Sequence, residues 1–135
     1  MEKPLTIALI VVRPGPLRDS LQTLMNSMPQ IRIVAESRDV SALLQLGAQL
    51  PPDLVLMEAS LPGNEVCAAV YQIKAKWART RTVVLVENAR QQQEALAAGA
   101  DAVLYQGFPA ARLIAVVEEL LPNHTRPGAG EILTS

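Results

Sequence analysis

An acidic residue ends a strongly apolar stretch in the middle of this sequence. Residues 53–63 read DLVLMEASLPG, in which Glu58 follows four consecutive apolar residues and comes before a Pro-Gly turn. A carboxylate in such a position can pair with a cation, bind a metal ion or act as a nucleophile. The residues that the fold brings beside Glu58 decide which of these it does.

Other catalytic and cofactor-binding patterns do not occur in the sequence. It contains no HExxH, GxGxxG, P-loop, CxxC or GxSxG motif. The single cysteine, Cys67, excludes an internal disulfide and is expected to be a small core or semi-core residue. The single histidine, His124, is expected in solvent. Four acids flank predicted strands and are expected to be solvated: Glu36, Asp53, Glu87 and Asp101. The sequence therefore predicts no metal site and no cofactor.

The composition is that of one small domain with an aliphatic core. The chain has 135 residues, of which 50% are hydrophobic and only 3% aromatic. A net charge of −1 gives no indication that this domain binds nucleic acid or a membrane surface directly. The N-terminal apolar run is too short for a signal peptide or a membrane span, so a cytoplasmic location is expected.

Five short apolar runs alternate with amphipathic segments along the chain. The runs cover residues 7–12, 31–35, 54–57, 83–86 and 102–105, and their nearly continuous apolar character suits strands that are buried on both faces. Apolar residues between the runs recur at helical spacing, which predicts a helix in each interval, the second around residues 40–50. Asn88 and Gly99 are suited to begin and end the fourth of these helices. This alternation predicts an α/β fold: a doubly wound, five-stranded parallel sheet in the flavodoxin-like order 2-1-3-4-5, with helices on both faces.

The last residues differ from the rest of the chain. The segment PNHTRPGAGEILTS is rich in proline and glycine and has no apolar periodicity. We therefore expect a domain over residues 1–121, followed over residues 122–135 by a linker or tail that leads to an output domain.

Three blocks of the sequence resemble the receiver domain of bacterial two-component response regulators. The block IALIVV…PLRDSLQTLM is similar to the family's first strand and helix, and PPDLVLMEASLPGNEV is similar to its third strand, phosphorylation site and following loop. The block EALAAGADAVLYQGFPAARLIAVVEELL is similar to its fourth helix through its fifth. The resemblance covers about residues 5–121 and implies a signal-transduction module of a two-component system or phosphorelay.

The same resemblance implies a set of chemical positions from which this sequence departs. In the family, two acids hold a magnesium ion, an aspartate accepts the phosphoryl group, and a hydroxyl residue and a lysine complete the site. The acid pair falls on Val12 and Arg13, the phosphoacceptor on Glu58, the hydroxyl on Val86, the lysine on Gln106 and the aromatic switch position on Val103. Without these groups, efficient phosphorylation of Glu58 is not expected. The chain therefore resembles an atypical receiver, or pseudo-receiver.

Three interpretations of Glu58 stay open at this point. Its charge can imitate a phosphorylated aspartate. It can instead form an ion pair with Arg13 that replaces the metal ion, since a guanidinium matches a carboxylate with two hydrogen bonds. It can also be a partly solvated acid without a special partner. The ion pair is favoured, because both residues are predicted to project from the carboxyl ends of neighbouring strands.

Receivers act through, or dimerise at, the surface of their fourth helix, fifth strand and fifth helix. The corresponding interaction face of this chain would carry residues 91–93, Tyr105, Phe108, Arg112 and Glu119. The resemblance therefore implies a partner protein, a homodimer through this face, or an output domain after the linker. The residues EILTS are similar to the lead-in of a helix-turn-helix domain, which makes a DNA-binding transcriptional output one candidate.

Three other functions are kept as alternatives. A small ligand can bind in the crevice at the carboxyl ends of the strands, which is the usual ligand site of such sheets. A conventional phosphoacceptor receiver is disfavoured by the departures at its chemical positions. An enzyme of the flavin or cobalamin type is disfavoured because the phosphate-binding loop and the histidine motif are missing. The sequence therefore favours a regulatory module over an enzyme.

Overall fold

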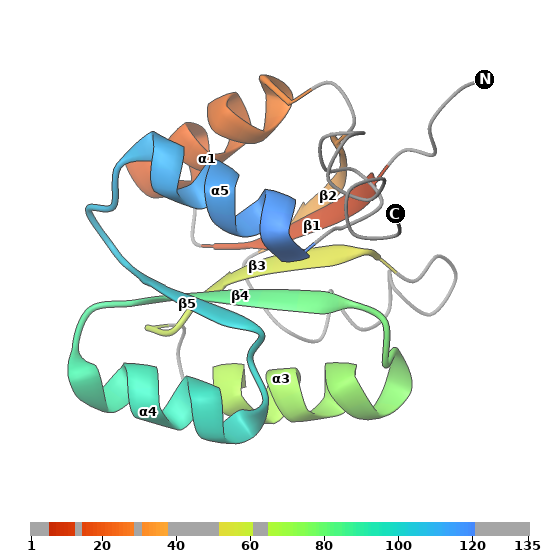
Figure 1. Ribbon diagram of the computed structural model, residues 1–135, viewed down its shortest axis with the longest axis vertical. Coiled ribbons are helices and arrows are strands. Elements are labelled where there is room, and N and C mark those ends of the chain that lie inside the picture. Colours follow the sequence, from red (N-terminus) through yellow and green to blue (C-terminus); the bar gives the residue numbers. More distant parts are fainter. Residues whose placement is uncertain (1–5, 13–14, 29–30, 38–51, 61–64, 121–135) are drawn as a thin grey trace, which may run out of the picture.

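A computed structural model describes residues 6–12, 15–28, 31–37, 52–60 and 65–120 of the chain (Figure 1). Its strands are β1 (Thr6–Val11), β2 (Ile31–Ser37), β3 (Leu54–Glu58), β4 (Arg81–Val86) and β5 (Ala102–Tyr105). Its helices are α1 (Pro16–Asn26), α3 (Glu65–Lys76), α4 (Ala89–Ala98) and α5 (Ala110–Leu120). None of these helices combines the length and the apolar character needed to span a bilayer. The helix predicted around residues 40–50 and the linker predicted over residues 122–135 lie outside the described residues.

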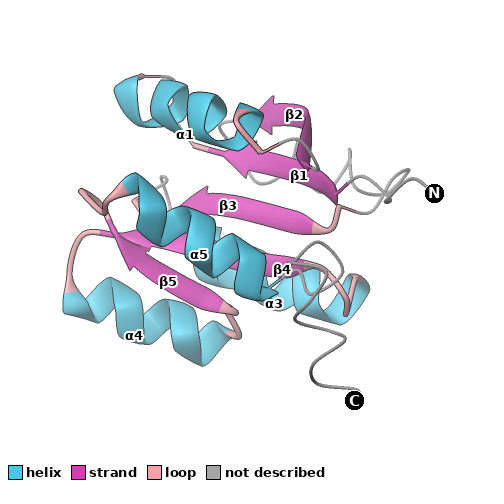
Figure 2. Ribbon diagram, turned by 45° about the horizontal axis from the view of Figure 1, so that its top comes forward, coloured by secondary structure: helices cyan, strands magenta, loops and turns pink. Residues whose placement is uncertain are grey.

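The strands form one sheet in the order β2-β1-β3-β4-β5. Each neighbouring pair of strands is parallel. Figures 1 and 2 show that α1 and α5 cover one face of the sheet, while α3 and α4 cover the other. The predicted α/β class, a parallel sheet between two layers of helices, is therefore confirmed.

The central strand β3 separates two apolar layers. All of its residues are buried, and successive side chains point to opposite faces of the sheet. Leu56 packs in a layer with residues of α1 and α5, whereas Met57 packs in a second layer with residues of α3 and α4. A strand that is covered on both faces needs no polar alternation, which explains the continuous apolar run before Glu58.

The helix α4 begins and ends at the two residues that the sequence indicated. The side chain of Asn88 accepts a hydrogen bond from the backbone N–H of Gln91 at 2.8 Å. Gly99 follows the helix with a φ of 112°, a conformation that favours glycine because a Cβ atom would strain the backbone. The chain turns at Gly99 into the segment that carries Asp101.

Asp101 joins α3, β4 and β5 at the amino edge of the sheet. Its carboxylate pairs with Lys74 Nζ at 2.7 Å and accepts a hydrogen bond from the backbone N–H of Thr82 at 2.8 Å. The guanidinium of Arg81 approaches the same carboxylate at 3.4 Å. Because the Asp101 side chain is only 15% exposed, the expectation that it is a solvated acid is wrong. Two cations from other elements compensate its charge.

We predict that Asp101→Asn destabilises the domain by about 1–3 kcal/mol, because it removes the charged acceptor of Lys74 and of the partly buried Thr82 N–H. Urea unfolding followed by circular dichroism gives the free energy of unfolding. Glu94→Gln is the matched control, since its ion pair with Arg90 is 3.9 Å long and exposed. The control should change stability by no more than about 0.5 kcal/mol. Equal losses in the two variants would contradict the role assigned to Asp101.

Candidate functional site

The carboxyl ends of four strands meet at one edge of the sheet. Val12 directly follows β1, Glu58 ends β3, Val86 ends β4 and Gln106 directly follows β5. The backbone N–H of Gln106 donates to the carbonyl oxygen of Val86 at 2.8 Å, which holds the ends of β4 and β5 side by side. The structure thus brings four of the predicted site positions to one edge, whereas Arg13 lies outside the described residues.

Glu58 is buried rather than solvated. Only 3% of the residue is exposed. A buried carboxylate needs hydrogen bonds or an opposite charge, because moving it out of water without a partner costs several kcal/mol. The interpretation of Glu58 as a partly solvated acid is therefore wrong. Its ion pair with Arg13 stays a prediction, because Arg13 lies outside the described residues.

The other predicted positions at this edge are mostly apolar and packed. Val12 and Val86 are fully buried, and they belong to the core layers on opposite faces of the sheet. Val103 packs against the same layer as Val86, and Gln106 is partly exposed. Within the described ranges, no group of three or more His, Cys, Asp or Glu side chains is arranged to hold a metal ion. The described part of the edge thus holds a buried carboxylate together with two fully buried valines.

A cation that the sequence analysis did not single out lies at the same edge. Arg18, in the first turn of α1, donates from Nε to the carbonyl oxygen of Val12 at 2.9 Å, and a second guanidinium nitrogen donates to the same oxygen. A positive charge is unfavourable in the first turn of a helix, where the backbone N–H groups already carry partial positive charge. That mismatch is the sequence signal that could have marked Arg18 as a residue with a specific partner.

Part of the predicted interaction face is exposed and contains large apolar groups. The Tyr105 hydroxyl donates to Oε1 of Gln92 in α4 at 2.8 Å, and Tyr105 is still 43% exposed. Leu96 of α4 is 49% exposed, and Arg112 and Glu119 of α5 are also exposed. Exposed apolar residues interleaved with polar ones are common at surfaces that bind other proteins.

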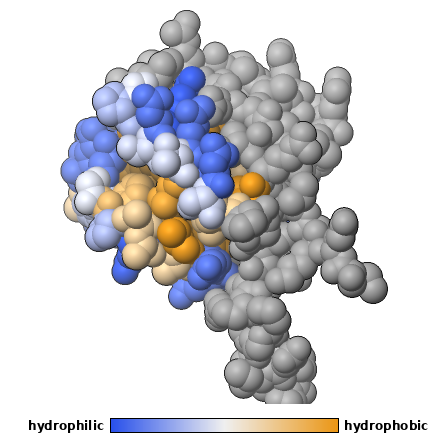
Figure 3. All heavy atoms as spheres, turned by 90° about the horizontal axis from the view of Figure 1, so that it is seen from above, coloured by the Kyte–Doolittle hydropathy of each residue, from blue (hydrophilic) through white to orange (hydrophobic). Residues whose placement is uncertain are grey.

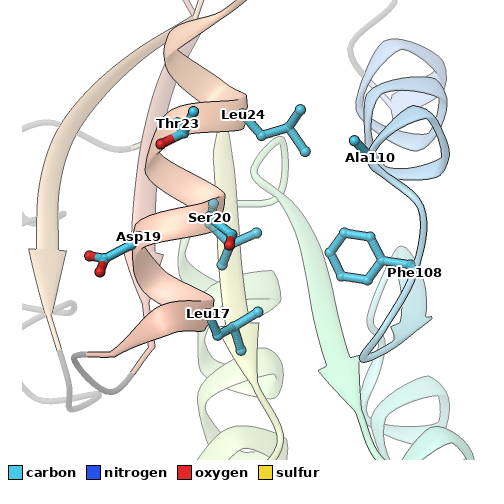
Figure 4. A pocket seen from close by; sticks show the side chains of 8 residues that line it. Leu17, Asp19, Ser20, Thr23, Leu24, Phe108 and Ala110 are labelled. Carbon is cyan, nitrogen blue, oxygen red and sulfur yellow. The ribbon is translucent and has the colours of Figure 1, made fainter.

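Phe108 does not lie on this face. Its ring points toward α1 and lines a groove of about 520 Å³ between α1 and the start of α5 (Figure 4). Leu17 and Leu24 of α1 and Ala110 of α5 line the same groove. The placement of Phe108 with Tyr105 on one interaction face is therefore corrected, because the two side chains serve different surfaces.

Cys67 lies near the end of β3 in an environment that suppresses its reactivity. It is partly exposed and lines a small cavity of about 30 Å³ with Ala59, Arg90 and Glu94. Burial, and to a smaller extent the negative charge of Glu94, raise the pKa of the Cys67 thiol above its ordinary value. A raised pKa leaves less thiolate at neutral pH, so Cys67 is a poor nucleophile.

We predict that Cys67 is alkylated by iodoacetamide more slowly in the folded chain than in the urea-unfolded chain, because burial disfavours the thiolate. The pH profile of the alkylation rate measures this shift. The apparent pKa should move down in Glu94→Gln and stay unchanged in Glu119→Gln. Since the folded thiol keeps its proton to higher pH than the unfolded one, stability should fall as the pH rises above the unfolded pKa. A profile that Glu94→Gln leaves unchanged would refute the contribution of Glu94.

No family model matches the chain. Over 136 aligned positions the sequence is 28% identical to the nitrate/nitrite response regulator protein NarL of Escherichia coli (strain K12). The alignment covers 99% of this chain and 59% of NarL, so the chain spans less than two thirds of the length of this curated relative.

Solved structures of response regulators have the same fold. A two-component response regulator of the LuxR family from Aurantimonas sp. SI85-9A1 superposes with a TM-score of 0.78 at 21% identity, covering 94% of each chain. RcsB from Salmonella enterica serovar Typhimurium, bound to the promoter rprA, superposes with a TM-score of 0.75 at 15% identity, covering 87% of this chain and 61% of RcsB.

The chain therefore has the fold of a response-regulator receiver domain. Its sequence is similar to that of NarL, a nitrate/nitrite response regulator, and this supports the resemblance seen in the three sequence blocks.

Proposed function

We propose that this chain is a regulatory module of signal transduction, a response-regulator receiver that works without phosphorylation and acts through contacts with a partner protein or a second copy of itself. The observation that carries the proposal is that Glu58 and Val86 are both buried at the ends of the adjacent strands β3 and β4. At the position of the phosphoacceptor the chain has an acid that is 3% exposed, and at the position of the hydroxyl it has a fully buried valine.

The physical requirements of phosphoryl transfer support this proposal. Magnesium binds oxygen ligands in near-octahedral geometry, and the fully buried side chain of Val12 offers none. The carbonyl oxygen of Val12 is already engaged by the guanidinium of Arg18. Gln106 carries no charge to stabilise a transferred phosphoryl group. Because losing one stabilising donor typically costs about 10²–10³ in rate, losing several makes the reaction ineffective.

We predict that magnesium with beryllofluoride leaves the amide NMR signals of residues 57–60, 85–88 and 104–107 unchanged in the full chain. Acetyl phosphate should add no phosphoryl group by intact mass, because the ligands for the metal and the phosphoryl oxygens are missing. The matched control combines Val12→Asp, Arg13→Asp, Glu58→Asp, Val86→Thr and Gln106→Lys, which restores the metal ligands together with the other groups of the family and should gain a response. Shifts at these residues in the native chain would reject phosphorylation independence.

We further infer that Arg13 compensates the charge of Glu58 in the place of a metal ion. Two observations support the inference. The register of β1 and β3 pairs Val11 with Met57. The next residues along the two strands, Val12 and Glu58, therefore lie at the same edge of the sheet, and Arg13 directly follows Val12. A carboxylate that is 3% exposed also needs a compensating charge or hydrogen bonds.

A double-mutant cycle tests this ion pair. Arg13→Gln and Glu58→Gln should each lower the free energy of unfolding by about 3–5 kcal/mol, because each leaves the other charge buried and uncompensated. The double variant should lose clearly less than the sum, with a coupling energy of about 1–3 kcal/mol from urea unfolding. Arg18→Gln with Glu58→Gln is the matched control and should give a smaller coupling. A coupling near zero between Arg13 and Glu58 would reject the pair.

We propose that the output of this module is a DNA-binding domain that follows the predicted linker, with transcription as the regulated process. The chain matches only 59% of the length of NarL and 61% of RcsB, and the RcsB structure contains promoter DNA. The contact surface proposed for a partner or second copy is the exposed part of α4, β5 and α5. The exposed side chains of Leu96 and Tyr105 support this choice, because burying them on association is favourable.

A further inference from the structure

The face formed by α1 and α5 carries an apolar groove that the proposed receiver function does not use. Figure 3 views this side of the molecule, and apolar side chains gather there between polar ones. The groove has a volume of about 520 Å³. Its apolar lining consists of Leu17, Leu21, Leu24, Phe108 and Ala110.

The side chains inside the groove set the chemistry of its occupant. Phe108 points from the start of α5 toward α1, and Leu24 faces Ala110 across the gap (Figure 4). Asp19 and Thr23, two of the three polar lining residues of α1, point away from α5, and Ser20 is the third. An apolar groove without convergent charged groups selects aliphatic side chains over a charged small molecule.

We propose that the groove holds this chain's own segment 122–135, with Ile132 and Leu133 seated between α1 and α5. The proposal rests on the proposed function in one respect, that this segment is the linker to the output domain. Ile132 and Leu133 are the only large apolar residues of the segment, and the residues before them are polar or small or are prolines. They are therefore the part of the linker that gains most from leaving water.

The segment is long enough to reach from the end of α5 back to the groove. The helix α5 forms one wall of the groove and covers 11 residues from Ala110 to Leu120. Its length is about 16 Å at 1.5 Å per residue. Residues 122–131 in an extended conformation reach about 33 Å, roughly twice the distance back along the helix. The linker is therefore long enough to turn after α5 and bring Ile132 to the groove.

Tethering makes a weak contact sufficient. A segment joined by a short flexible linker is present at an effective concentration in the mM range, so a groove affinity of about 1 mM leaves about half of the molecules docked. Docking holds the linker against α5 and fixes the direction in which the following domain leaves the receiver. The groove thereby couples the position of the output domain to the surface of α1 and α5.

Paramagnetic NMR on the full chain tests the docking. The chain carries Cys67→Ala and Ser135→Cys, with a nitroxide on the new cysteine. We expect the amide signals of residues 17–24 and 108–110 to lose about half of their intensity relative to the reduced label, while those of α3 keep theirs. Ile132→Ser with Leu133→Ser should restore the signals, and Thr134→Ser is the matched control that should not.

Three outcomes would overturn the proposal. Signal loss that is absent or equally spread over the surface shows that the segment does not dock. Loss that the Ile132→Ser and Leu133→Ser changes do not relieve shows that other residues direct it. Loss that appears only when labelled and unlabelled chains are mixed, and that grows with concentration, assigns the groove to a second copy. The beryllofluoride experiment tests the response at Glu58, and the paramagnetic experiment tests docking in the groove. A failure of phosphorylation independence is therefore distinguishable from a failure of docking.

Discussion

The burial of one carboxylate at the end of the central strand constrains the rest of this domain. β3 is buried over its whole length and ends at Glu58, so the charge lies where neither face of the sheet is open to water. An uncompensated charge in such a place costs more than a few apolar contacts return. Such a charge needs hydrogen bonds or an opposite charge within reach of the end of β3. The side chains of Val12 and Val86, at two of the neighbouring strand ends, are apolar and cannot supply it.

Aliphatic side chains pack closely at this edge of the sheet. Val86 belongs to the core layer beneath α3 and α4, and Val103 packs against that layer. A hydroxyl and an aromatic ring stand at these two positions in the receivers that the sequence resembles. Two β-branched aliphatic side chains in their place restrict rotamers and exclude water, so the edge behaves as core. In the function that we propose, the same two valines account both for the close packing and for the missing reactive groups.

The features that could be predicted from the sequence are those that depend on local patterns. The apolar run before Glu58 indicated a strand covered on both faces, and Asn88 and Gly99 marked the ends of α4 through backbone requirements that each residue type meets by itself. Asp101 and Phe108 were misjudged because their environments depend on other elements. Asp101 meets Lys74 only after α3 and β5 are placed on the sheet, and no local spacing encodes the direction of the Phe108 ring.

The short connection between β5 and α5 ties the three surfaces of the domain together. Tyr105 is hydrogen-bonded to Gln92 of α4, Gln106 lies at the edge that carries Glu58, and Phe108 lines the groove against α1. Gly107 stands between them with a φ of 93°, a conformation that lets the chain reverse direction within so few residues. The three side chains therefore sit within four consecutive residues while facing three different surfaces. The connection thereby links the edge, the α4–β5 face and the groove through consecutive residues, which is the arrangement that our proposed regulation without phosphorylation requires.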